Sequence, residues 1–102
     1  MNTVVLIGRL GGEPVLTETK ENHSRTIIQL AVPRSYKNAD GIYETDFFRC
    51  VLWNGIAKRA KEYCKKGDII GIRGMLQSYK YEDKNYFKVV AEKVTFLSNK
   101  TE

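Results

Sequence analysis

The sequence predicts a small all-β protein, a five-stranded barrel with one helix between its third and fourth strands. Five segments are rich in β-branched and aromatic residues, turn residues separate them, and only one segment has helical spacing. The chain has 102 residues, which fits one compact domain and leaves little room for a second core.

The first two strands are each followed by residues that end a strand, Gly11, Gly12 and Pro14 after the first and Pro33 after the second. Residues 3–10 form an apolar, β-branched run, and residues 25–32 form a second one that stops before Pro33. Proline lacks the N–H that a strand needs for its ladder, so the second strand is expected to end there. The polar stretches 17–24 and 34–41 are predicted to be loops.

The third strand, residues 43–53, separates by parity into two faces. One face carries Tyr43, Thr45, Phe47, Arg49, Val51 and Trp53, and the other carries Glu44, Asp46, Phe48, Cys50 and Leu52. The second set supplies a core face through Phe48, Cys50 and Leu52. Phe47 and Trp53, with Arg49 between them, are therefore expected on a mixed, exposed surface.

A helix is predicted between Asn54 and Gly67. Its apolar residues fall at helical spacing, at Ile56, Ala57, Ala60, Tyr63 and Cys64. Asn54 is interpreted as the N-cap rather than as part of a hairpin turn, and Gly67 as the stop.

The fourth strand covers residues 68–81, and Gly71 and Gly74 within it indicate a bend or bulge. A turn at residues 83–85 leads to a fifth strand at residues 86–97. By parity the fourth strand has a core-like set, Ile70, Ile72, Gly74 and Leu76, and an opposite set, Arg73, Gln77, Tyr79 and Tyr81.

This β-β-β-α-β-β order matches the partly open Greek-key barrel called the OB-fold. A plain five-stranded α+β sheet is the structural alternative. The domain is predicted to cover residues 1–97, with a frayed polar C-terminus at residues 98–102.

Composition excludes several classes of function. The chain has one histidine, His23, and no cluster of metal-ligating residue types. No nucleophile is paired with a base as catalysis would require. The sequence therefore predicts no enzyme, no metal and no cofactor. Cys50 and Cys64 are expected to be reduced core residues of a cytoplasmic protein, although spacing alone leaves a disulfide open. No run is long enough to span a membrane.

Charge and aromatic residues together point to nucleic acid. The chain holds 17 Lys and Arg against 12 Asp and Glu, a net charge of +5, which suits a polyanion. Three segments interleave basic and aromatic side chains, an arrangement that binds phosphates and stacks bases. The alternative is that each ring belongs to the core or a subunit interface. The predicted DNA-binding residues are Arg34, Tyr36, Phe47, Arg49, Trp53, Arg73, Tyr79, Lys80, Tyr81 and Lys84.

The chain resembles the bacterial and phage single-stranded DNA-binding protein (SSB) family over about residues 1–97. The matching stretches are Asn2–Pro14, Leu30-Ala-Val, Thr45–Trp53, Ala57–Gly67 and Gly74-x-Leu76. The resemblance implies an OB-fold that assembles as a homotetramer and wraps single-stranded DNA. It places the stacking aromatics on Tyr36, Phe47, Trp53 and Tyr81, the strand arginine on Arg49 and a basic hairpin residue on Lys80.

The sequence departs from the family pattern at several positions. Tyr36, Phe47 and Tyr81 stand where many relatives carry Trp, and Phe48 stands where a polar residue, often His, can occur near the subunit contact. The family's acidic, Phe-terminated tail is absent, so recruitment of replication proteins through such a tail is not expected.

The predicted function is sequence-independent binding and protection of single-stranded DNA in replication, repair or recombination, in the cytoplasm and associated with the nucleoid. One alternative is a primosomal accessory OB protein, usually a dimer, that acts mainly through protein contacts. Another is an OB-type interaction module, or a domain of an enzyme, whose affinity for DNA is incidental.

Overall fold

The computed structural model describes residues 1–97, so the predicted frayed terminus at residues 98–102 lies outside the described residues. In chain order the elements are β1 (Val4–Leu10), β2 (Thr17–Glu18), β3 (Ser24–Lys37), β4 (Tyr43–Trp53), α1 (Asn54–Tyr63), β5 (Ile69–Tyr81) and β6 (Lys84–Phe96). The prediction of a barrel with one helix after the third long strand is confirmed.

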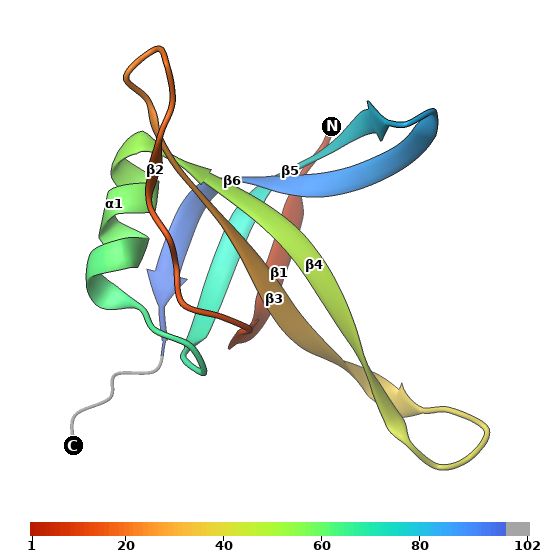
Figure 1. Ribbon diagram of the computed structural model, residues 1–102. Coiled ribbons are helices and arrows are strands. Elements are labelled where there is room, and N and C mark those ends of the chain that lie inside the picture. The colour runs from red at the N-terminus through yellow and green to blue at the C-terminus, as the bar shows by residue number, and fades with distance from the viewer. Residues whose placement is uncertain (98–102) are drawn as a thin grey trace.

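Five long strands close the barrel. β1 pairs antiparallel with β5 along most of its length and with β3 at its end, where Arg9 lies opposite Ala31. β5 pairs with β6, β3 pairs with β4, and a short parallel pairing of β4 with β6 completes the circle. In Figure 1, the β3–β4 and β5–β6 hairpins both extend away from the side of the barrel that carries α1.

Two glycines permit this closure. A Cβ on Gly8 would lie 2.5 Å from the carbonyl oxygen of Ala31, so only glycine lets β1 approach β3 this closely. A Cβ on Gly74 would lie 2.1 Å from the carbonyl oxygen of Val90. The register of β5 and β6 shifts between Arg73 and Gly74, which confirms the predicted bulge and bends β5 around the barrel.

The core lies between the barrel strands and α1, which packs against β3, β4 and β6. Its buried members are Leu10, Ile28, Leu30, Cys50, Leu52, Ala57, Ala60, Cys64, Ile70, Ile72, Val89 and Ala91. Both cysteines are free thiols, and burial raises the pKa of Cys50 to about 12 and that of Cys64 to about 11. No helix within residues 1–97 has the length and hydrophobicity to cross a membrane.

Two predicted core positions are exposed. Leu76 is 44% exposed because β5 continues there into the hairpin that leaves the barrel. Tyr63 is 61% exposed at the end of α1, where its ring lies tilted against that of Phe96, at 5.9 Å between centroids. Parity and helical spacing cannot tell where an element leaves the core, and both errors arise there.

The second strand is longer than predicted. β3 continues through Pro33, which pairs with Thr45, and runs to Lys37, so the expected loop at residues 34–41 begins only after Lys37. Proline is tolerated beside bulges, and the ladder becomes irregular directly after Pro33. The loop predicted at residues 17–24 likewise contains β2, which pairs with the start of β3.

The ends of α1 also differ from the prediction. Trp53 occupies the N-cap position and no side chain caps the helix. Asn54 is the first helical residue, and its Oδ1 accepts a hydrogen bond from the backbone N–H of Ser24 at 3.1 Å. The helix ends at Tyr63, before the predicted stop at Gly67, which adopts a positive φ of 94° in the following turn.

Candidate nucleic-acid interface

The two faces of β4 differ as their sequence predicts. Cys50 and Leu52 are fully buried and Phe48 packs against the core, whereas Phe47 is 61% exposed and Arg49 is exposed. Val51 departs from the prediction of a mixed, exposed face. It lies on the same face of β4 as Phe47, yet it is buried, with neighbouring strands β3 and β6 on either side. A mixed strip therefore runs along β4 from Phe47 to Trp53.

A hollow of about 500 Å³ opens between β4 and the β5–β6 hairpin. We call it the aromatic groove, and its lining residues are Phe47, Arg49, Tyr79, Tyr81, Tyr86 and Phe87. Five aromatic rings and one guanidinium at a single hollow can contact bases and phosphates together.

The hairpin side of the groove is ordered by cross-strand pairing. Tyr79 lies opposite Tyr86, and their rings stack with 5.6 Å between centroids. The ammonium of Lys88 lies 5.1 Å from the centre of the Tyr79 ring. Residues directly opposite share a face of the sheet, so Lys84, opposite Tyr81, lies on the same side as these tyrosines.

The predicted Lys80 has a different position. It lies opposite Asn85, and alternation along β5 places it on the face away from Tyr79 and Tyr81. Arg73 is also separate from the groove, because it lines another hollow with Val5 and Lys93.

The sequence predicted the last turn at residues 83–85, one residue too late at its start and two at its end. The turn is Glu82–Asp83, with φ of 50° and 64°, and β6 begins at Lys84. Positive φ at both central residues is typical of a type I′ hairpin turn. A two-residue turn at this position would have placed Tyr86 opposite Tyr79. The sequence could therefore have predicted that Tyr86 lies at the aromatic groove. Nothing comparable in the sequence indicated that Phe87 borders the same groove.

Trp53, at the other end of the strip, is partly buried by polar neighbours. Arg25, opposite it on β3, holds its guanidinium carbon 5.8 Å from the centre of the indole ring. His23 meets the indole edge-on, at 6.4 Å between centroids, and its Nδ1 lies 3.3 Å from Oδ1 of Asn54. The sequence prediction omitted Arg25, which the β3–β4 register would have identified.

The tip of the β3–β4 hairpin carries Tyr36, which is 62% exposed. The guanidinium of Arg34 does not stand free beside it. Its Nε and Nη2 donate to both carboxylate oxygens of Asp46, at 3.0 and 2.9 Å, and its Nη1 donates to Glu44 at 2.7 Å. Hydrogen bonding with Asp46 raises the pKa of Arg34 further, and hydrogen bonding from Arg34 lowers the pKa of Asp46.

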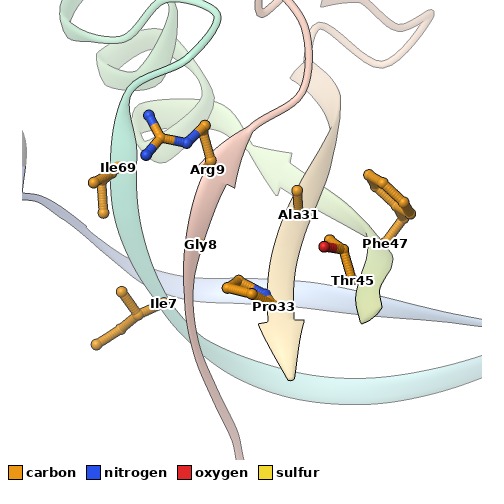
Figure 2. A pocket seen from close by; sticks show the side chains of 8 residues that line it. All are labelled: Ile7, Gly8, Arg9, Ala31, Pro33, Thr45, Phe47 and Ile69. Carbon is orange, nitrogen blue, oxygen red and sulfur yellow. The ribbon is translucent and has the colours of Figure 1, made fainter. Parts of the chain in front are cut away.

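A second hollow, also of about 500 Å³, lies between β1 and the β3–β4 pair. Figure 2 shows its lining residues: Ile7, Gly8, Arg9, Ala31, Pro33, Thr45, Phe47 and Ile69. Phe47 borders both hollows, so this one ring connects them. Arg9 is held at the rim by a hydrogen bond from its Nη1 to the carbonyl oxygen of Gly67 at 2.8 Å.

Within residues 1–97, no three His, Cys, Asp or Glu side chains gather closely enough to hold a metal ion together. The arrangement is that of a binding surface, with exposed rings and cations on two adjacent hairpins.

Comparison with solved structures agrees with this fold. A solved structure titled "Plasmodium falciparum SSB complex with ssDNA" superposes with a TM-score of 0.86 over 96% of both chains, at 22% sequence identity. That likeness confirms the OB-fold.

Sequence comparison gives nearer relatives. Single-stranded DNA-binding protein 1 of Lactococcus lactis is 42% identical over 108 residues, covering 100% of this chain and 72% of the relative. Single-stranded DNA-binding protein B of Bacillus subtilis is 38% identical over 104 residues, covering 97% of this chain and 92% of the relative. Residues 1–97 match the family described as the Single-strand binding protein family. The chain therefore belongs to the single-strand binding protein family.

Proposed function

We propose that this protein binds and protects single-stranded DNA without sequence preference, in replication, repair or recombination. The observation that carries the proposal is the aromatic groove, in which Phe47 and Arg49 of β4 face Tyr79 and Tyr81 of the β5–β6 hairpin. Stacking on such rings is worth about 1–3 kcal/mol per base and tolerates any base. The names of the relatives, which are single-stranded DNA-binding proteins, support it.

In this proposal the strand lies in the aromatic groove and continues along β4. Bases stack on Phe47, Tyr79 and Tyr81, with Tyr36 and Trp53 serving bases at either end. Phosphates are neutralised by cations, for which we propose the exposed Arg49 and Lys84 at the groove, the half-buried Arg25 beside Trp53, and the exposed Arg73 and Lys80 where the strand leaves the groove.

We further propose that the protein is a homotetramer that acts in the cytoplasm, on DNA of the nucleoid. Val5 and Ile7 on β1 are 68% and 58% exposed, and apolar patches of this kind favour a subunit interface. The mass in solution separates this proposal from a dimeric primosomal accessory protein that acts through protein contacts.

The test is an anisotropy titration of labelled oligo-dT, with a duplex of equal length as competitor. We expect saturable binding to the single strand and clearly weaker binding to the duplex, with the logarithm of affinity falling by about 0.7 per phosphate neutralised for each tenfold rise in salt. Equal affinity for both forms would instead indicate incidental attraction by the net charge of +5.

A further inference from the structure

The β3–β4 hairpin continues beyond the barrel, and the core does not continue with it. On the core-facing side of the two strands, Leu30 lies opposite Phe48, and the next pair toward the tip is Val32 opposite Asp46. β1 pairs with β3 only at Leu30 and Ala31. The distal part of the hairpin, residues 33–46, which we call the arm, therefore needs another source of order.

The backbone ladder is also interrupted in the arm. After Pro33 opposite Thr45, the next pair is Lys37 opposite Tyr43, so residues 34–36 of β3 face Glu44 alone. Arg34 lies at this interruption. Its guanidinium reaches across to Glu44 and Asp46 of β4 through three hydrogen bonds of 2.7–3.0 Å. Bidentate pairing of this kind holds both distance and orientation.

The same network extends to the tip of the arm. The second carboxylate oxygen of Glu44 accepts a hydrogen bond from Nδ2 of Asn38 at 3.1 Å. The amide oxygen of Asn38 accepts from the backbone N–H groups of Asp40 and Ile42, at 2.9 and 3.0 Å. One connected set of polar side chains thus replaces the missing core along the arm.

We propose that Arg34 is a positioning residue that holds the arm, and with it Tyr36, in place to receive single-stranded DNA, and that it does not bind phosphate. This inference rests on the proposed function. One cation shared between two carboxylates leaves a cluster of net negative charge, which does not attract a phosphate. Alternation along β4 also places Asp46, and hence the bound guanidinium, on the face opposite Phe47.

The test compares Asp46→Ala with Arg34→Gln. Removing a carboxylate from a DNA-binding protein tightens binding if charge alone decides. If Arg34 positions the arm, Asp46→Ala instead weakens binding to oligo-dT about 2- to 12-fold. This is the cost of ordering one side chain on binding, which the variant would have to meet because the arm is no longer held in place. Arg34→Gln weakens binding to a similar extent, and the double variant is no weaker than either single one. The salt slope stays that of the wild type.

Glu62→Ala is the matched control, since it removes the same charge from the exposed side of α1. If Asp46→Ala tightens binding, or if Arg34→Gln flattens the salt slope by about 0.7, Arg34 contacts phosphate and the proposal is overturned. Glu44→Gln, at a side chain that is 48% exposed, is the milder variant to use if Asp46→Ala lowers the melting temperature strongly.

A readout without DNA keeps the two proposals separate. Trypsin cuts after Lys37, at the end of β3, and its rate there reports how often the arm opens. We expect Arg34→Gln and Asp46→Ala to accelerate this cut several-fold, with the cleavage site identified by mass. An unchanged rate would refute the positioning role. Failure of the wild type to bind oligo-dT would refute the proposed function and leave the trypsin result to decide on the arm.

Discussion

Replacing Phe47 by alanine tests whether this ring serves DNA binding or the stability of the fold. The ring is 61% exposed and borders both hollows, of which Figure 2 shows the one beside β1. Full burial of a phenylalanine is worth about 1.5–3 kcal/mol, so with less than half of this ring covered we expect the free energy of unfolding to fall by no more than about 1 kcal/mol. One stacked base is worth about 1–3 kcal/mol, which corresponds to binding weakened about 5- to 150-fold.

The assay is the oligo-dT anisotropy titration, paired with urea unfolding of the same preparation. Tyr63→Ala is the matched control, because Tyr63 is equally exposed on α1 and should affect binding little. The salt slope of Phe47→Ala should equal that of the wild type, since no charge is removed. A large loss of stability with unchanged affinity would refute the reasoning, because Phe47 would then be a structural ring.

Three further predictions concern the scaffold. Gly74→Ala should destabilise the fold by about 1–3 kcal/mol in urea unfolding, because its Cβ would meet a carbonyl of β6 at 2.1 Å; wild-type stability would mean that the bulge adapts. Cys50 and Cys64 should resist a thiol reagent at pH 8 and react once the chain is unfolded, since their raised pKa values disfavour the thiolate; rapid labelling of the native protein would contradict their burial. The pKa of Asp46, followed through its carboxyl ¹³C signal, should lie below the ordinary value of 3.8 and should rise toward that value in Arg34→Gln. Because the folded pKa is depressed, the ion pair should stabilise the arm above about pH 4 and be lost as the pH falls through the folded pKa; an identical titration in both proteins would exclude the pair.

Local sequence patterns correctly predicted the structural features that depend on a single strand. The alternation in β4 identified the core face of Cys50 and Leu52 and the exposed position of Phe47. The two glycines of β5 predicted the bulge at Gly74. These features depend on period and backbone sterics, which a single segment contains.

Features that depend on pairing between segments were missed. Pro33 suggested a strand end, yet the irregular ladder beside it lets β3 continue to Lys37. The carboxylate partners of Arg34, ten and twelve residues later, were missed because they become its neighbours only in the folded hairpin. Arg25 was overlooked for the same reason, since its position over Trp53 follows from strand register.

Trp53 provides the most direct test of the central claim, that single-stranded DNA follows the strip along β4. It is the only tryptophan in the chain and lies at one end of that strip. Titration with oligo-dT should quench its fluorescence saturably, and added salt should reverse the quenching. Binding that leaves the Trp53 emission unchanged would place the DNA elsewhere on the protein and contradict the account.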